Sequence, residues 1–117
     1  MQLFDTVHIA LERALSGASQ RHAALSENIA NVNTVGYKRK DVDFHSALQA
    51  AMPGGSSAIA NVPFATATDD AAPVRADGNS VDMDTENAGL AQNALEYEAL
   101  TQVLRSRDDI LRSAMGV

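Results

Sequence analysis

Residues 4–32 read "FDTVHIALERALSGASQRHAALSENIANV", and the spacing of their apolar side chains decides the fold. Apolar and small positions recur after alternating steps of four and three residues, which places them on one face of a helix. We therefore predict an N-terminal helix over residues 1–33, with Asp5 or Thr6 as its N-cap. Its apolar seam consists of Phe4, His8, Leu11, Leu15, Ala18, His22, Leu25, Ile29 and Val32.

A second seam of the same kind lies near the C-terminus and predicts a helix over residues 84–116. Asp84 is a suitable N-cap, and Glu86 lies in the first turn, where the positive end of the helix dipole favours a carboxylate. Gly116 closes the pattern. This seam consists of Leu90, Ala94, Tyr97, Leu100, Leu104, Leu111 and Met115.

The segment between the two helices, residues 34–83, has a different character. Residues 41–52, "DVDFHSALQAAM", are compatible with a short helix that starts at Asp41 or Asp43. Residues 53–80 combine Pro, Gly, Ser, Ala and Asp without a sustained period, which predicts a flexible loop or a segment disordered until bound. The expected fold is all-α: one domain, residues 1–117, in which two long terminal helices form a coiled-coil hairpin.

A hairpin of two helices is a poor independent fold, because each helix has a single neighbour and much of its surface stays wet. Small residues beside the seams would let further helices approach closely. The layout therefore indicates a self-associating subunit that is ordered by neighbours. These small residues are Ala10, Ala14, Ala23, Ala30, Ala91, Ala94 and Ala99.

The composition excludes several classes of function. A formal net charge of −6 argues against capture of nucleic acid or of an anionic membrane surface. The chain has no cysteine, so thiolate metal sites and thiol catalysis are excluded. No stretch approaches the roughly 20 apolar residues of a membrane span, so we expect no direct membrane insertion. The N-terminus lacks the pattern of a secretory signal peptide, so a route outside the cytoplasm would be one that cleaves no signal.

We expect no catalytic, cofactor or metal site. His8 and His22 are separated by roughly 21 Å of helix and cannot ligate one metal, and His45 has no partner at ligand spacing. The acidic string of residues 77–86 fails the calcium-loop pattern, because Gly78 comes second rather than sixth. The basic run of residues 37–40, "YKRK", is a weak nucleic-acid patch. It better suits acidic surfaces of neighbouring subunits or the negative end of the first helix.

Residues 28–40, "NIANVNTVGYKRK", form an elaborate helix end. Asn31 or Asn33 can take the left-handed conformation that stops a helix, and Gly36 can supply a second positive φ. Thr34 can bond local backbone, and Tyr37 offers a ring to pack and a hydroxyl to anchor. Beside the seam, Asn28 is placed to hydrogen-bond across to another chain.

This string resembles the signature of flagellar rod and hook axial proteins, in which an N-terminal helix ends in S/A-x-N-I/L-A-N-x-x-T-x-G-Y-K/R. Further resemblance, to proximal rod subunits, covers residues 14–31, 39–48 and 77–107. Val35 replaces the proline that is usual in proximal rod proteins, and the middle segment leaves little room for a surface domain. The matching residues are Ser26, Asn28, Ile29, Ala30, Asn31, Thr34, Gly36, Tyr37 and Lys38.

The resemblance implies a structural subunit of the periplasmic rod, the shaft that joins the membrane ring to the hook. It implies self-association and contacts with the rod proteins FlgC, FlgF and FlgG, the adaptor FliE and the membrane-ring protein FliF. It also implies passage through the flagellar type III export apparatus, for which Phe44 and Leu48 in "FHSAL" fit an export element in an accessible linker. The alternatives are another rod subunit resembling FlgC, or a soluble helical adaptor or chaperone that binds partner helices.

Overall fold

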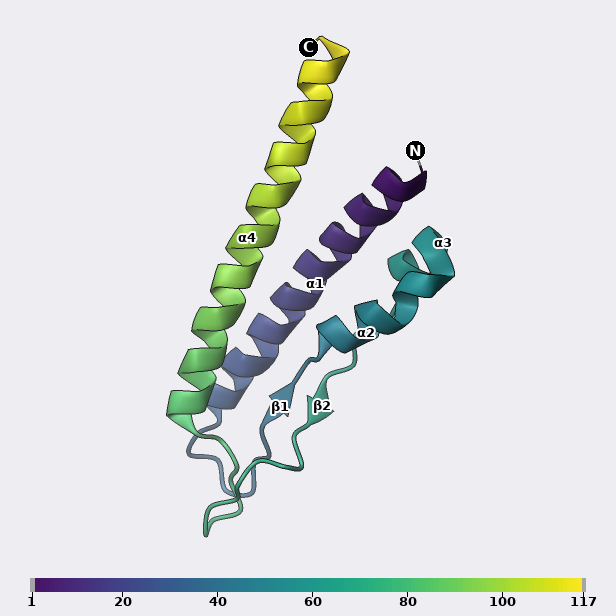
Figure 1. Cartoon of the computed structure of the whole chain (residues 1–117). Coiled ribbons are helices and arrows are strands. Elements are labelled where there is room, and N and C mark those ends of the chain that lie inside the picture. The colour runs from purple at the N-terminus through teal and green to yellow at the C-terminus, as the bar shows by residue number, and fades with distance from the viewer. Residues whose placement is uncertain (1, 117) are drawn as a thin grey trace.

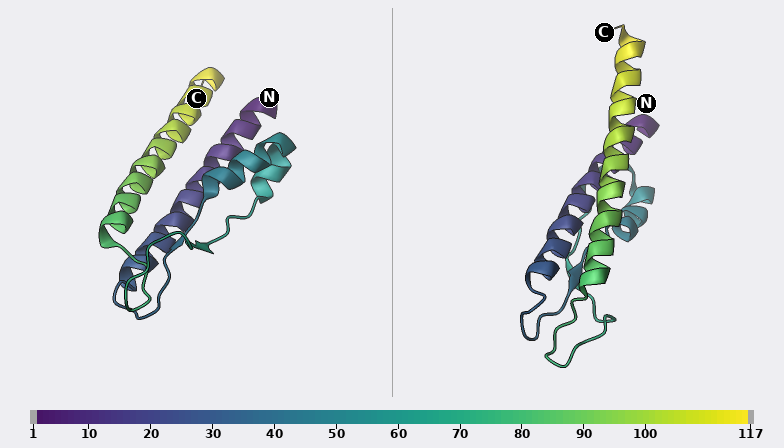
Figure 2. Two further views of the ribbon diagram at one scale, coloured as in Figure 1. Left: turned by 60° about the horizontal axis from the view of Figure 1, so that its bottom comes forward. Right: turned by 90° about the vertical axis from the view of Figure 1, so that its left-hand side faces the viewer.

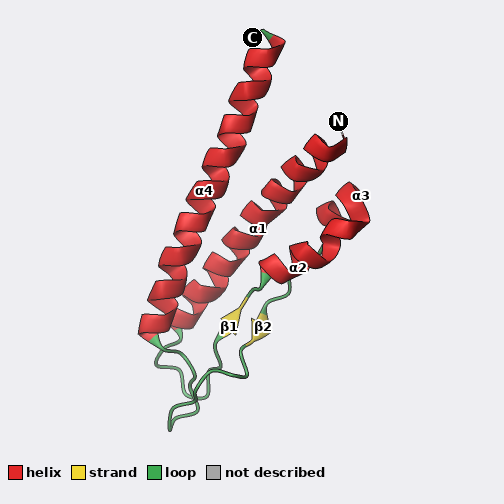
Figure 3. Cartoon of the chain, viewed as in Figure 1, coloured by secondary structure: helices red, strands yellow, loops and turns green. Residues whose placement is uncertain are grey.

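The computed structural model describes residues 2–116, and it is dominated by two long helices (Figures 1 and 3). Two strands pair in a short antiparallel ladder, in which Lys40 pairs with Thr68 and Asp41 with Ala67. The predicted all-α fold is confirmed. The elements in chain order are α1 (Gln2–Ala30), β1 (Lys40–Asp41), α2 (Phe44–Ala51), the 3₁₀ turn η1 (Met52–Gly54), α3 (Gly55–Asn61), β2 (Ala67–Thr68) and α4 (Met83–Met115).

Helices α1 and α4 lie side by side and antiparallel (Figures 1 and 2). Leu25 is fully buried between them. Gly89 keeps the helices close, because a Cβ at this position would lie 3.2 Å from Leu25 Cδ1. At the far end Arg107 Nη2 donates to the carbonyl of Phe4, 3.1 Å away. Ile110 and Leu111 still lie beside Phe4, and the C-terminal turn of α4 extends past the start of α1 (Figure 1).

Helices α2 and α3 cover the side of α1 that faces away from α4 (Figure 1). Phe44 is fully buried and packs edge-on against Phe64 at a centroid distance of 6.1 Å. Gly17 makes room for this ring, because a Cβ there would lie 2.5 Å from Phe44 Cγ. Val42, Phe44 and Phe64 of the middle segment thus form one apolar cluster with Ala18 and Ala24 of α1. Ile59 of α3 is also buried.

The middle segment is more structured than the sequence indicated. The short helix is confirmed as α2, and its N-cap is Asp43, whose carboxylate accepts from Ser46 N. The expectation that residues 53–80 lack regular structure is wrong for α3 and β2. Periodicity failed there because these elements are short: α3 buries the single side chain of Ile59, and both residues of β2 are exposed.

The ends of the long helices differ from those expected. Helix α1 begins at Gln2, so neither Asp5 nor Thr6 is an N-cap, and Thr6 instead shares a hydrogen bond with Ser56 of α3. Helix α1 ends at Ala30, three residues early. The N-cap of α4 is Asp82 rather than Asp84, because the Asp82 carboxylate accepts from the backbone N of residue 84.

Candidate functional site

Four buried polar side chains meet where α1 ends and α4 begins. They come from the last turn of α1, the two loops below it in Figure 1, and the first turn of α4. We call this cluster the polar junction: Asn28, Arg39, Asn79 and Glu86. All four lie in or beside the stretches that carry the family-like motif, so the junction is the best-defined polar site in the described chain.

Asn28 uses its whole hydrogen-bonding capacity inside the chain. Its Nδ2 donates to the carbonyl of Lys40 at 2.7 Å and to Glu86 Oε2 at 3.0 Å. Its Oδ1 accepts from the Tyr37 hydroxyl at 3.1 Å and from the backbone N of Lys40 at 2.9 Å. The prediction that Asn28 bonds across to another chain is wrong, because no donor or acceptor of its amide is left over.

Arg39 and Glu86 form a buried ion pair across the junction. Arg39 Nε donates to Glu86 Oε1 at 2.6 Å, and Nη1 donates to Asp69 Oδ2 at 2.7 Å. The hydrogen bond to Glu86 raises the pKa of Arg39 further above its usual value, against the opposing effect of burial. Removing one partner of such a pair would strand a buried charge, so the pair ties the two loops to α4.

Asn79 caps α1 from the opposite loop. Its Nδ2 lies within 3.1 Å of the carbonyl oxygens of residues 31, 32 and 34, which follow the last turn of α1. Its Oδ1 accepts from the backbone N of Val81 at 2.7 Å. Because this side chain gathers the carbonyls, the left-handed turn predicted at Asn31 or Asn33 is not needed. No residue other than glycine has positive φ between residues 2 and 116, which corrects that prediction.

Two glycines let the loops meet backbone to backbone. Gly36 has φ of 75°, as predicted, and Gly78 has φ of 83°. Gly36 N donates to the carbonyl of Asp77 at 2.9 Å. A Cβ on Gly78 would lie 3.2 Å from Gly36 Cα, so a side chain there would push the loops apart.

The other motif residues are used locally. Thr34 bonds Asn31 through both backbone and side chain, as predicted. Burial raises the pKa of the Tyr37 hydroxyl that anchors to Asn28. Lys38 Nζ donates to the carbonyl of Gly78 at 2.6 Å. Within the motif, Asn28 is buried, Ile29, Asn31 and Tyr37 are half-buried, and Ala30, Thr34, Gly36 and Lys38 are exposed.

The basic run is largely consumed inside the chain, which corrects its expected role toward neighbouring subunits. Arg39 is in the junction, and Lys40 Nζ lies 3.5 Å from Glu27 Oε1. Nearby, Arg21 Nε donates to Asp41 Oδ1 at 2.9 Å. Burial alone would raise the pKa of Asp41, but the hydrogen bonds from Arg21 and the backbone of residue 42 hold it below its usual value.

The seam residues divide between the inside and the surface. Leu25 is buried. Tyr97 and Leu111 are exposed despite their seam positions. Among the other predicted seam residues, Ala18 is buried and Phe4, His22, Ala94 and Met115 are exposed. The rest are half-buried: His8, Leu11, Leu15, Ile29, Val32, Leu90, Leu100 and Leu104.

The far side of α4 carries further exposed apolar side chains, which the seam did not include. Leu95 is 69% exposed, Ile110 68% and Val103 46%. Among the described elements α4 packs only on α1, apart from a side-chain pair between His45 and Glu96. We call the exposed set Leu95, Gln102, Val103 and Ile110 the outer ridge.

The proposed export element is not an accessible linker in the folded chain, which corrects that expectation. Phe44 is fully buried in the core, and Leu48 packs against the same cluster. The Phe44 ring is therefore inaccessible as long as the chain is folded.

The sequence reasoning missed the roles of Arg39, Asn79 and Glu86. From sequence alone, Asn79 stands in the acidic string that fails the calcium-loop pattern, and Glu86 is predicted only as a carboxylate at the positive end of the helix dipole. Each of their key partners is at least 45 residues away, so no local spacing could identify them. Over residues 2–116 no group of three potential ligands gathers for a metal, and none of the helices there is long and apolar enough to cross a membrane.

Comparison with known proteins gives a consistent result. Residues 10–38 match the family model described as "Flagella basal body rod protein". The chain is 32% identical to the flagellar basal body rod protein FlgB of Escherichia coli (strain K12), over 87% of this chain and 90% of the relative. It is 30% identical to the protein of that name from Bacillus subtilis (strain 168), over 98% and 97% of the two chains.

Proposed function

Because this chain belongs to the FlgB family of flagellar basal body rod proteins, and is thus a structural subunit of the rod, we propose that its helical hairpin is a torque-bearing element of the proximal rod. Family membership removes the two alternatives raised above, a FlgC-like subunit and a soluble adaptor or chaperone. We assign the chain no catalytic role.

The exposed outer ridge is the observation that carries the proposal. Within the hairpin, Leu95 and Ile110 stay more than two thirds exposed, although Ile110 lies beside Phe4 at the start of α1. Contiguous exposed apolar surface marks an interaction site. Neighbouring subunits that cover this helix would bury it, so the hairpin is ordered in the assembly by helices of other chains.

The polar junction has a mechanical role in this proposal. It fixes how the chain leaves α1 and enters α4 through charged and amide groups that are buried within one subunit. The exposed motif residues Ala30, Thr34, Gly36 and Lys38 then face other subunits, so residues 28–38 set the geometry of a subunit junction while the Asn28 amide stays bonded within its own chain. A rigid junction between the end of α1 and the start of α4 lets torque pass along the two helices.

The chain assembles with other components of the flagellar basal body. We propose that these are further copies of itself, FlgC, FlgF, FlgG, FliE and FliF, and that it reaches the periplasmic rod through the flagellar type III export apparatus without a cleaved signal. The support is the motif of residues 28–38 together with family membership.

Complementation of a flagellated host that lacks its own FlgB tests the rod assignment. The wild-type chain should restore basal bodies and motility. Leu95→Gln with Ile110→Gln should abolish rods while leaving the folded chain intact, because both side chains are exposed. Glu98→Gln, an exposed control on the same helix, should behave like wild type. Wild-type rods from the double variant would contradict the proposal.

Circular dichroism and hydrogen exchange on the purified chain complete the test. Helical termini that gain protection only on assembly support a rod subunit. Full protection of α4 along its whole length, including its exposed C-terminal turns, in a dilute monomer would count against one.

Export is tested separately at Phe44. Phe44→Ala should lower secretion of the subunit. Phe64→Ala removes the ring that packs on Phe44 but leaves Phe44 and Leu48 in place, so it should not lower secretion. Unaltered secretion of the Phe44 variant, or an equal loss in both, would exclude a specific export element.

A further inference from the structure

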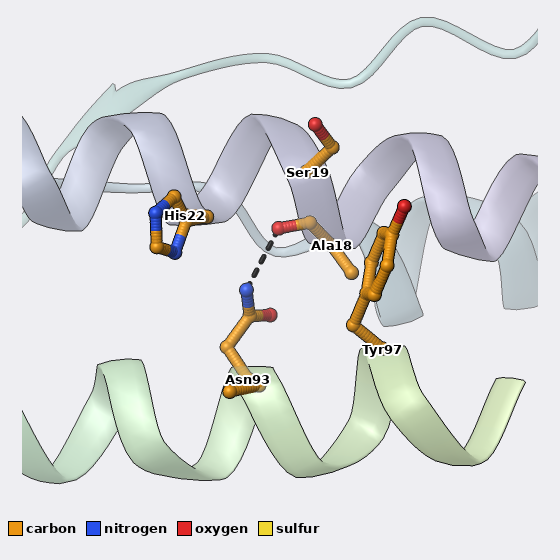
Figure 4. A pocket seen from close by; sticks show the side chains of 6 residues that line it. Ala18, Ser19, His22, Asn93 and Tyr97 are labelled. Atoms are coloured by element: carbon orange, nitrogen blue, oxygen red, sulfur yellow. Dashed lines mark hydrogen bonds between the residues drawn. The ribbon is translucent and has the colours of Figure 1, made fainter. Parts of the chain in front are cut away.

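A hollow of about 330 Å³ opens between α1 and α4 on the face opposite α2. Figure 4 shows it between the two helices, with Asn93 rising from α4 and Tyr97 beside it. The hollow has about ten times the volume that a water molecule occupies in the liquid, so a side chain fits. We call it the groove: Ala18, Ser19, His22, Asn93, Ala94 and Tyr97.

Asn93 is only half satisfied within the described chain. It is 2% exposed, and its Nδ2 donates to the carbonyl of Ala18 at 2.7 Å (Figure 4). Its Oδ1 is buried and has no hydrogen-bond partner among residues 2–116. Figure 4 places this oxygen on the side of the groove occupied by Tyr97. A buried acceptor without a donor is costly, by about 1–3 kcal/mol.

The outer ridge offers a matching donor on a different face of α4. Each residue turns a helix by about 100°, so Leu95 and Gln102 lie roughly 200° around from the α1-facing positions 93 and 100. Gln102 is exposed, and it is the amide donor among the apolar members of the ridge. A ridge of this shape can enter a groove lined by Ala18, Ser19 and Ala94, because small residues let helices approach closely.

Charge also favours this pairing between copies. The chain carries a net charge of −6, which opposes self-association. The ridge has no ionisable side chain, and the groove has only His22. The residues named for the two surfaces therefore add no carboxylate to the contact, and the carboxylates of Glu98 and Asp109 lie at its edge.

We propose that the groove holds the outer ridge of a second copy of this chain, with Gln102 of that copy donating to Asn93 Oδ1 after the Tyr97 ring turns aside. Groove and ridge lie on different faces of one subunit, so the contact is head-to-tail and propagates rather than closing into a two-fold dimer. This inference rests on the proposed rod function. It adds that the groove of one copy contacts the outer ridge of the next.

Disulfide trapping tests the pairing, because the natural chain has no cysteine. Ala94→Cys and Gln102→Cys chains are co-expressed in the complemented host, and basal bodies are isolated and oxidised. The expected product joins position 94 of one copy to position 102 of another. Basal bodies that contain both chains without this product, or with products joining equal positions, would overturn the inference while leaving the rod function standing. Absence of the wild-type chain from basal bodies would instead refute the rod function.

A competition measurement tests the role of Asn93 without cysteines. Wild-type and Asn93→Leu chains are co-expressed, and their ratio in basal bodies is compared with their ratio in the cell. The variant should be depleted about tenfold, the effect of losing one buried hydrogen bond. Its melting temperature should not fall, since the stranded oxygen is gone. Asn87→Leu, exposed on the same helix, is the control. Equal incorporation of the Asn93 variant would overturn the inference.

Discussion

Replacing Asn28 by Asp changes one group of the polar junction without changing its size. The Nδ2 that now donates to Lys40 and Glu86 becomes a carboxylate oxygen that can donate to neither. The substitution therefore removes two hydrogen bonds and places a second carboxylate about 3 Å from a buried glutamate, a separation taken from the present contact of 3.0 Å.

Two free energies compete in this variant. Two charges about 3 Å apart repel by roughly 5 kcal/mol at an effective dielectric constant near 20. Keeping a proton on one carboxyl with an ordinary pKa near 4 costs about 4 kcal/mol at pH 7, since each pH unit is worth about 1.4 kcal/mol. The cost of keeping the proton is smaller than the repulsion, so one carboxyl of the folded variant stays protonated. With about 1 kcal/mol for the lost bond to Lys40, the total is about 5 kcal/mol at pH 7.

The decisive assay is urea unfolding followed by circular dichroism across pH 4 to 8. In the folded variant the pKa of the pair formed by the introduced carboxyl and Glu86 is raised, so the loss in unfolding free energy grows as pH rises above about 4 and shrinks to about 1–2 kcal/mol near pH 4. Asn33→Asp, an exposed change in the same loop, should show almost no loss. A loss for the Asn28 variant that does not vary with pH would refute the assigned contacts.

Three other contacts give predictions of the same kind. Gly17→Ala should destabilise by about 1–3 kcal/mol in thermal unfolding despite the better helix propensity of Ala, because its Cβ would overlap the ring of Phe44; in a Phe44→Ala background the same change should become neutral or stabilising, and a loss in both would contradict the overlap. Asn79→Ala should lower the unfolding free energy by about 2–4 kcal/mol, since it strands a backbone N and removes a cap, with faster hydrogen exchange at the end of α1 as the check. Asp41 has a lowered pKa in the fold, so its contribution is complete above its ordinary value of 3.8 and is lost as pH falls through the folded pKa; Asp41→Asn should flatten the acid limb of a stability profile, and an unchanged limb would contradict the bond with Arg21.

The long helices were predictable because the apolar spacing that indicates a helix recurs over many turns of the chain. Leu25 and Leu104 belong to patterns several turns long, so one unexpected residue does not hide the period. Gly36 was also predictable, because positive φ nearly demands glycine.

The junction was not predictable, since each of its contacts is made once and over a long separation. Asn79 looks like any turn asparagine until the end of α1 lies beside it, 45 to 48 residues away in sequence. The buried state of Glu86 depends on Arg39, and neither side chain alone indicates a core position. The packing of Phe44 was hidden for a related reason, because its partner surface is a glycine that leaves no apolar signal.

The cap supplied by Asn79 also bears on timing. A chain emerges from the ribosome N-terminus first. Asn79, which donates to the carbonyl of Asn31, is therefore synthesised 48 residues after Asn31. Glu86, which accepts from Asn28, is synthesised later still. Until then the end of α1 has only water and local partners, such as the Asn31 amide that donates to the carbonyl of Glu27. Helix α1 is synthesised first, but the hydrogen bonds at its C-terminal end are among the last to form. This order keeps a nascent chain from folding early into half of its structure.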